Sequence, residues 1–276
     1  MLKKNIFCLD SDVILLTGGA GLLGSQYTEV LLESGATVVV FDINAESLNT
    51  LENRFSNMYK NKIFTYKVDI TKESDILNAK DEIFNKINKY PNVLINNAAI
   101  DPKFDNSSNI NKSRLENFSI DQWNLEISVG LTGAMLCSKI FGIEMAKNNK
   151  GVIINVSSDL GVIAPDQRLY KKENLSDFEQ DVKPVTYSVI KHGIIGLTKY
   201  IASYWADKGV RCNAFAPGGV FNNHSKDFLD KIEELIPMKR MANIDEYNAT
   251  IIYLCSEASS YMNGAILNMD GGRTII

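Results

Sequence analysis

Histidine and cysteine, the residues that most often build metal centres, are scarce in this chain of 276 residues. The histidines are His192 and His224, and the four cysteines, at positions 8, 137, 212 and 255, form no Cys-x-x-Cys pair. This set argues against a zinc knuckle, a disulfide framework or a histidine-rich metal centre, so we expect reduced thiols and no metal. Proton transfer near neutral pH is then expected to use a side chain other than histidine.

Positive charge is not in excess either, because 29 Lys and Arg stand against 33 Asp and Glu, a net charge of −4. This balance argues against a general nucleic-acid-binding protein. Since no run of 18 apolar residues occurs, we expect no membrane partner and a cytoplasmic location. With 45% apolar residues, the chain is expected to form one domain over residues 1–276.

Short β-branched segments alternate with longer amphipathic ones from end to end. The longer segments carry apolar residues at spacings of three and four, as in Ile76, Ala79, Ile83 and Ile87. The alternation predicts an α/β fold with a doubly wound parallel sheet of seven strands and helices on both faces. The expected strands cover residues 13–17, 37–41, 63–68, 93–96, 152–157, 210–216 and 266–269.

A glycine-rich turn at residues 17–24 follows the first expected strand and precedes an amphipathic helix. Glycine lets the backbone approach a pyrophosphate, and the helix N-terminus presents amides and a partial positive charge. In this context the turn predicts a dinucleotide site rather than an ordinary turn. We expect Gly18, Gly21, Leu23 and Gly24 to contact the cofactor.

Asp42 ends the second expected strand, 18 residues after Gly24. A carboxylate at this place can accept both ribose hydroxyls of the adenosine half and would repel a 2′-phosphate. No Lys or Arg lies in the glycine turn or within two residues of Asp42, so the sequence favours NAD over NADP. The alternative is a solvated aspartate at a strand end.

Tyr187 and Lys191 lie four residues apart, so on a helix they share a face. A nearby ammonium stabilises the phenolate of a group that otherwise titrates near 10, which yields a usable base near neutral pH. By itself this spacing is more often that of a surface pair. Together with the glycine turn and Ser158, it indicates a catalytic pair.

This Tyr-x-x-x-Lys motif and its companions resemble those of the short-chain dehydrogenase/reductase family, in its single-domain branch with a Rossmann fold. The resemblance covers nearly the whole chain and includes the order in which the motifs occur. The companion motifs are Asn-Asn-Ala-Ala at 96–99, Asn-Val-Ser-Ser at 155–158, Pro-Gly-Gly at 217–219 and Asp-Gly-Gly at 270–272.

The resemblance implies a role for each matching position. Lys191 would also hold the nicotinamide ribose, and Ser158 would hydrogen-bond the reacting oxygen. The further cofactor contacts implied are Asp69, Ile70, Asn97, Ala98, Pro217, Gly218 and Val220, beside Tyr187 and Lys191. The alternative for each of these seven further positions is an ordinary turn residue at a strand end.

The chain departs from the family pattern in several places. Leu22 replaces a glycine of the single-domain branch, which gives the glycine spacing of the extended branch of epimerases and dehydratases. Gly130 stands where the single-domain branch has an asparagine, and in that branch the asparagine supports a water relay to the lysine. Asn222 stands where the single-domain branch commonly has a threonine. An insertion at about residues 166–184 separates Ser158 from Tyr187, and we interpret it as a substrate lid or wall rather than a solvated loop.

These observations favour an NAD-dependent oxidoreductase that moves a hydride between nicotinamide and a secondary alcohol or ketone, with Tyr187 as the general acid/base. Similarity to dehydrogenases of flagellin-modification and nonulosonic acid pathways favours a sugar-like substrate, with Arg168 or Lys172 as candidates for meeting a phosphate. The alternatives are a nucleotide-sugar epimerase or dehydratase with tightly bound NAD, and a non-catalytic NAD sensor. Long apolar helices at 127–147 and 185–208 predict a homotetramer or homodimer.

Overall fold

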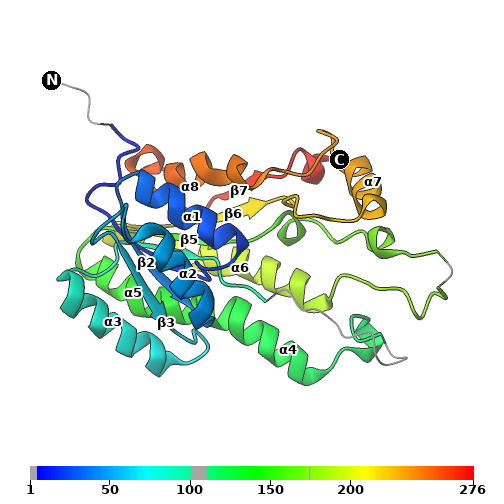
Figure 1. Ribbon diagram of the computed structural model, residues 1–276, viewed down its shortest axis with the longest axis horizontal. Coiled ribbons are helices and arrows are strands. Elements are labelled where there is room, and N and C mark those ends of the chain that lie inside the picture. Colours follow the sequence, from blue (N-terminus) through cyan, green and yellow to red (C-terminus); the bar gives the residue numbers. More distant parts are fainter. Residues whose placement is uncertain (1–4, 101–110, 174) are drawn as a thin grey trace.

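The structure, a computed structural model, describes residues 5–100, 111–173 and 175–276. Its strands form one parallel sheet in the order β3-β2-β1-β4-β5-β6-β7 (Figure 1). The central strands are buried on both faces, as expected for β-branched runs in a parallel sheet. The fold prediction is therefore confirmed, and each strand begins and ends within one residue of expectation. The strands are β1 (Val13–Thr17), β2 (Thr37–Asp42), β3 (Ile63–Lys67), β4 (Val93–Asn96), β5 (Gly151–Val156), β6 (Val210–Pro217) and β7 (Ile266–Met269).

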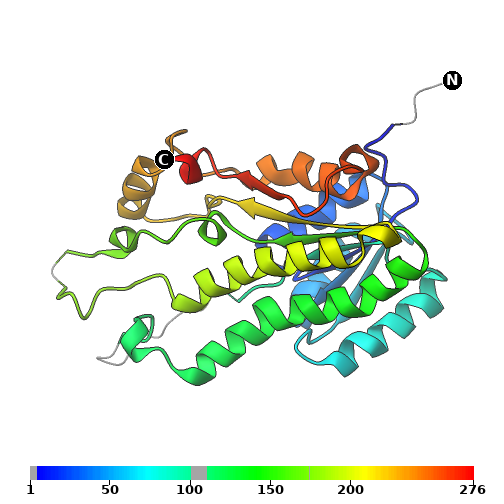
Figure 2. The same ribbon diagram turned by 180° about the vertical axis from the view of Figure 1, so that it is seen from behind.

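Helices cover both faces of the sheet, and each layer closes its own hydrophobic core. Helices α1, α2 and α8 lie on one face, and α3, α5 and α6 lie on the other (Figures 1 and 2). This two-sided cover leaves the carboxyl ends of the strands at one edge, where α7 and the segment 166–184 lie. The helices are α1 (Leu22–Glu33), α2 (Ala45–Phe55), α3 (Glu73–Ile87), α4 (Ile120–Ile127), α5 (Gly133–Lys147), α6 (Val185–Tyr204), α7 (Lys226–Glu234) and α8 (Asn248–Cys255).

Helices α4 and α5 form one continuous run through a π-helical turn at Ser128–Thr132. This run begins at Ile120, earlier than residue 127, where the sequence analysis placed the start of the helix. The helix predicted over 185–208 ends at Tyr204, and a short 3-10 turn follows it. By length and composition, Ile120–Lys147 would suffice to cross a membrane. It instead packs against α3, α6 and the sheet, as a core helix does (Figure 2).

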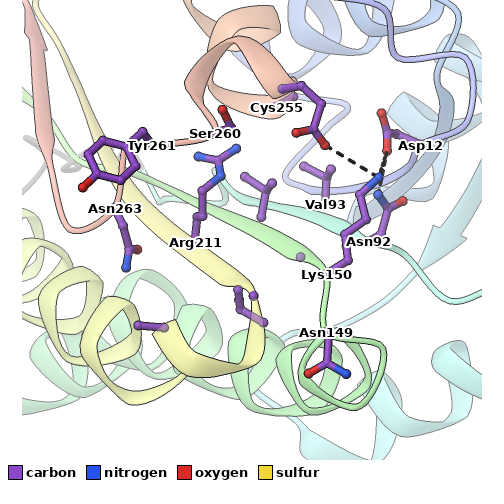
Figure 3. A pocket seen from close by; sticks show the side chains of 16 residues that line it. Asp12, Asn92, Val93, Asn149, Lys150, Arg211, Cys255, Ser260, Tyr261 and Asn263 are labelled. Atoms are coloured by element: carbon purple, nitrogen blue, oxygen red, sulfur yellow. Dashed lines mark hydrogen bonds and ion pairs between the residues drawn. The ribbon is translucent and has the colours of Figure 1, made fainter. Parts of the chain in front are cut away.

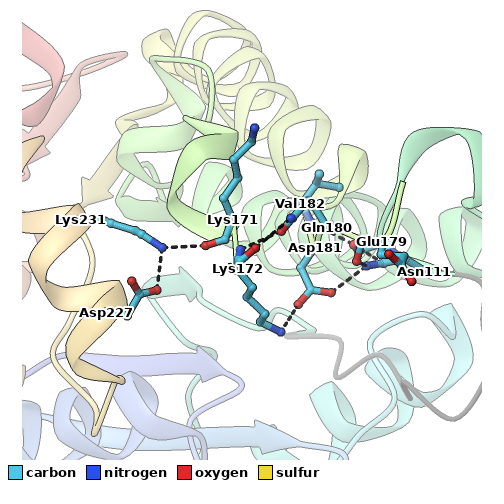
Figure 4. A network of polar contacts seen from close by, with 10 residues as sticks. Asn111, Lys171, Lys172, Glu179, Gln180, Asp181, Val182, Asp227 and Lys231 are labelled. Atoms are coloured by element: carbon cyan, nitrogen blue, oxygen red, sulfur yellow. Dashed lines mark hydrogen bonds and ion pairs between the residues drawn. The ribbon is translucent and has the colours of Figure 1, made fainter. Parts of the chain in front are cut away.

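The segment 166–184 is held between α7 and the chain that precedes α4 (Figure 4). Leu169 is buried against Ile232, Ile236 and Met241, and Lys231 of α7 donates to the carbonyl of Lys171 at 2.7 Å. On the other side, the Asn111 amide donates to an Asp181 carboxylate oxygen at 2.8 Å. The segment therefore has buried and hydrogen-bonded contacts on both sides, unlike a loop that only projects into solvent.

Candidate active site

Lys191 connects Tyr187 to the end of β5. Its ammonium donates to the carbonyl of Val156 at 2.9 Å and lies 5.7 Å from the centre of the Tyr187 ring. The Ser157 hydroxyl donates to the Lys191 carbonyl at 2.8 Å, so the same turn of α6 is fixed to β5 twice. Because Ser158 follows directly, the structure brings the three proposed catalytic residues to one edge of the sheet.

Ser158 is oriented by an ion pair that the sequence did not indicate. Its hydroxyl donates to Asp159 at 2.7 Å, and Asp159 in turn accepts from Arg273 at 2.7 Å. The side chains of Asp159 and Arg273 are 4% and 8% exposed, so the pair is shielded from water. Asp159 is adjacent to Ser158 in sequence, but no pattern pointed to an arginine 114 residues further on.

The ammonium of Lys191 sits in an unusual electrostatic setting. Burial, followed by the positive charge of Lys183, lowers the pKa of Lys191 from 10.5 to about 8. Lys183 itself lies on the ring of Tyr187, with its ammonium 3.9 Å from the ring centre. Two ammonium groups therefore lie near one phenol ring, and sequence spacing had identified only that of Lys191.

The glycine turn is locked against the end of β4. The Asn97 amide donates to the carbonyls of Thr17 and Gly18, both at 3.1 Å, and the Thr17 hydroxyl accepts from the N–H groups of Asn97 and Ala98. Gly18 has φ +62°, and a Cβ there would lie 2.8 Å from the Cα of Ala98. Asn97 and Ala98 thus shape the turn in which a pyrophosphate would sit.

Helix α1 begins at this turn with its first amides directed to the same edge. A Cβ on Gly24 would lie 2.1 Å from the carbonyl oxygen of Gly18, so the close approach of helix and turn requires glycine there. Gly21 is exposed, and among the described residues no side chain caps the helix at this position. Leu23 is half-buried and packs on the core. These features fit a phosphate group at the N-terminus of α1.

Asp42 lies at the turn as well. One carboxylate oxygen accepts from the N–H of Ala20 at 3.1 Å and the other from the N–H of Asn44 at 3.0 Å. The side chain is half-buried and is thus fixed beside the glycine turn with lone pairs left for further donors. This placement fits recognition of ribose hydroxyls.

The remaining predicted cofactor residues lie at strand ends along the same edge. Asp69 accepts from the N–H and hydroxyl of Thr71 and pairs with Lys72 at 3.2 Å; the Thr71 hydroxyl bond is the main reason why its pKa lies below 3.8. The side chain of Ile70 is buried against Gly133 of α5. Its side chain therefore belongs to the core, which leaves the main chain of Ile70 for any cofactor contact.

Pro217 ends β6, and Gly218 and Val220 follow it at the same edge of the sheet. The N–H of Gly218 donates to Met269 at 2.9 Å, and its carbonyl accepts from the Tyr247 hydroxyl at 3.0 Å. Val220 forms a bridge with Ala242. The loop after β6 is therefore held in place by main-chain bonds.

Both side chains considered for binding a phosphate pair with acids of their own segment, 166–184. Arg168 binds Asp166 at 2.5 Å and Lys172 binds Asp181 at 2.6 Å. Arg168 and Lys172 would thus have to exchange partners to meet a phosphate.

The two histidines make local contacts. His192 is exposed on α6, with its Nδ1 2.9 Å from the carbonyl of Ser188, and His224 stacks on Phe228.

Gly130 lies in the π-helical turn, and Ile190 fills the space beside it. A Cβ at residue 130 would lie 2.7 Å from Cγ2 of Ile190, so an asparagine does not fit there without movement. The loss of the family asparagine is thus matched by a bulky neighbour on α6.

We expect Gly130→Asn to reduce the free energy of unfolding by about 1–3 kcal/mol, because the added side chain overpacks a filled site. In an Ile190→Ala background the same substitution should cost less. Gly196→Asn is the matched control, since a Cβ there meets nothing within 4 Å. Urea unfolding of the four variants measures these differences, and an equal cost of Gly130→Asn in both backgrounds would contradict the packing argument.

A separate hollow of about 640 Å³ lies at the opposite edge, at the amino ends of β4, β5 and β6 (Figure 3). Arg211 and Lys150 lie along it; Lys150 is 3.8 Å from Glu257 and 4.0 Å from Asp12. Its lining contains none of the predicted site residues, so it is distinct from the site at the carboxyl ends.

The doubly wound sheet with its glycine turn defines a Rossmann-type protein. A family model described as short chain dehydrogenase matches residues 12–170, and one described as Enoyl-(Acyl carrier protein) reductase matches residues 178–274. The chain belongs to the short-chain dehydrogenases, which are oxidoreductases that act on alcohol or ketone groups with a nicotinamide cofactor. The resemblance seen in the sequence is confirmed.

Curated relatives match along almost their whole length. A 3-oxoacyl-acyl-carrier-protein reductase of Aquifex aeolicus is 28% identical, covering 96% of this chain and 98% of the relative. A 2-dehydro-3-deoxy-D-gluconate 5-dehydrogenase of Bacillus subtilis is 28% identical, with 96% of each chain covered. The post-translational flagellin modification protein A of Campylobacter coli is 26% identical, covering 96% and 98%.

Two solved structures are similar in fold. A gluconate 5-dehydrogenase of Burkholderia cenocepacia in complex with NADP and tartrate has a TM-score of 0.83 at 26% identity, with 98% of each chain covered. A short chain dehydrogenase of Leptospira borgpetersenii with bound NAD+ has a TM-score of 0.83 at 30% identity, covering 99% of this chain and 97% of that one. Proteins of this fold thus bind either cofactor.

Proposed function

We propose that the chain is an NAD-dependent oxidoreductase that interconverts a secondary alcohol and a ketone on a sugar or sugar derivative. The placement of Lys191, between the end of β5 and the ring of Tyr187, carries this proposal. An ammonium held there favours the phenolate, which is the form of Tyr187 that accepts a proton from an alcohol.

In this mechanism Tyr187 takes the hydroxyl proton in oxidation and returns it in reduction. Ser158 would hydrogen-bond the reacting oxygen by turning its hydroxyl proton from Asp159 to the substrate, and Lys191 would hold the phenolate and a ribose hydroxyl. The nicotinamide group, when bound, supplies the hydride acceptor or donor. The half-buried position of Tyr187 limits the water that competes for its proton.

Asp42 supports NAD as the cofactor. We expect Asp42→Ala to weaken NADH binding about tenfold to a hundredfold, because charge-assisted bonds to the ribose contribute about 1.5–3 kcal/mol. The same variant should bind NADPH better, because the repulsion of a 2′-phosphate is removed. Asp42→Asn is the conservative comparison, since it removes the charge and keeps one acceptor oxygen for the N–H of Ala20, although the N–H of Asn44 loses its acceptor. Fluorescence titration with NADH and NADPH measures both effects, and an unchanged preference in Asp42→Ala would contradict the assignment.

The sugar-like substrate is supported by the relatives named for gluconate chemistry and flagellin modification. A rate screen of sugars, sugar acids, sugar phosphates and nucleotide sugars, each with NAD and with NADP, tests substrate and cofactor together. Turnover of acyl thioesters alone would overturn the sugar proposal. Stoichiometric NAD in the purified protein without net NADH formation would instead support an epimerase or dehydratase, and tight binding without any turnover would support a sensor.

We further propose one catalytic domain over residues 1–276, with the segment 166–184 as a wall of the substrate site, and a cytoplasmic homotetramer or homodimer. Exposed apolar side chains on α5 and α6 support association, among them Met135, Ile143 and the stacked pair Tyr200 and Tyr204. Sedimentation that shows a monomer at micromolar concentration would contradict the oligomer.

A further inference from the structure

Lys183 lies closer to the proposed catalytic tyrosine than Lys191 does. Its ammonium is 3.9 Å from the centre of the Tyr187 ring, against 5.7 Å for Lys191. A cation on the ring face is attracted by the neutral phenol through its quadrupole. When the phenol ionises, an attraction between full charges is added, so this cation interacts more strongly with the phenolate than with the phenol.

The main chain of Lys183 is fixed by the segment 166–184 itself. Its N–H donates to the side-chain oxygen of Gln167 at 2.8 Å, and its carbonyl accepts from the amide nitrogen of the same residue at 3.5 Å. Pro184, which is buried and precedes the first residue of α6, restricts the backbone further. The ammonium of Lys183 thus extends from a fixed base towards the ring of Tyr187.

The repulsion between Lys183 and Lys191 is unfavourable for the fold. Lys183 stands at the positive end of the α6 dipole and repels Lys191, whose pKa it helps to lower. Local rules of this kind are most often broken at functional sites. An ionised Tyr187 close to both lysines would compensate for the repulsion.

The acids on the elements packed against this part of α6 have other partners. Glu126 of α4 accepts from Thr186 and Gln122, and Asp159 after β5 accepts from Arg273. Asp181 pairs with Lys172, and Glu116 pairs with Arg114. Among the described residues, the charged groups shown on the Tyr187 ring itself are the ammonium groups of Lys183 and Lys191.

We propose that Lys183 is a positioning residue that, together with Lys191, favours the phenolate form of Tyr187. The proposal rests on the proposed function, in which Tyr187 transfers the proton. It assigns a catalytic purpose to the segment 166–184 beyond that of a substrate wall, because Gln167 in this segment holds Lys183 in place.

The test is a titration of Tyr187 without substrate, followed as the ultraviolet phenolate signal of each protein minus that of its Tyr187→Phe counterpart. Lys183→Met should move the midpoint upward by about one pH unit, a modest shift because Lys183 lines an open hollow of about 390 Å³. Lys183→Arg should retain the original midpoint. Lys171→Met is the matched control, since this lysine of the same segment is 62% exposed and lies 3.6 Å from Asp177.

Turnover gives the second measurement. The acid limb of the kcat profile should move with the titration, and rates should converge at high pH where the phenolate forms in both proteins. An unchanged midpoint in both Lys183→Met and Lys183→Gln would overturn the proposal, and a rise in KM for acidic substrates alone would make Lys183 a substrate anchor instead. A shifted midpoint in a protein without any turnover would uphold the role of Lys183 while the proposed function fails.

Discussion

Replacing Tyr187 by phenylalanine is expected to reduce kcat by a factor of about 10²–10⁴ while NADH still binds. The substitution removes the proton-transferring hydroxyl and leaves the ring, and the loss falls in the range that general acid–base groups contribute. The ring contacts of Lys183 and Lys191 remain available, so the local structure should persist.

Initial rates with the best substrate of the screen and fluorescence titration with NADH measure the two quantities separately. Tyr261→Phe is the matched control, because its side chain is fully exposed and lines the separate hollow at the opposite edge of the sheet. A Tyr187→Phe enzyme that keeps most of its rate would remove the tyrosine from the mechanism. Equal losses of NADH binding and turnover would instead indicate a role in cofactor binding.

Local patterns made the fold and part of the site predictable. Burial on both faces makes parallel strands nearly continuous apolar runs, so β1, β4 and β5 could be located from β-branched residues. Tyr187 and Lys191 are one helical turn apart, and this proximity follows from helix geometry without tertiary information.

The remaining features depend on contacts between distant segments. Ile190 fills the space beside Gly130 only because α6 packs on the π-helical turn. Lys183 lies four residues before Tyr187, and Lys191 lies four residues after Tyr187. Because Lys183 precedes the start of α6, helical spacing does not predict where its side chain lies. Its contact with the ring is set by Gln167 and Pro184.

The ion pair between Arg273 and Asp159 joins two residues that lie 114 positions apart in the sequence, so no local pattern could predict it. We expect Arg273→Met to reduce the free energy of unfolding by about 3–5 kcal/mol, because it leaves a buried carboxylate without its cation. The pair Arg240 and Glu246 offers a matched control: its side chains are 43% and 34% exposed, so Arg240→Met should destabilise the protein much less than Arg273→Met.

A second substitution separates the loss of charge pairing from the loss of packing. Asp159→Asn in the Arg273→Met background removes the stranded charge and keeps an acceptor for the N–H of Leu160, so the double variant should be more stable than Arg273→Met alone. If urea unfolding shows no such recovery, the cost lies in the packing of the arginine side chain. Since the Ser158 hydroxyl donates to the same carboxylate, kcat should fall in Arg273→Met even where the protein is fully folded. The ion pair then links the C-terminal turn of the chain to the orientation of the serine in the proposed reaction.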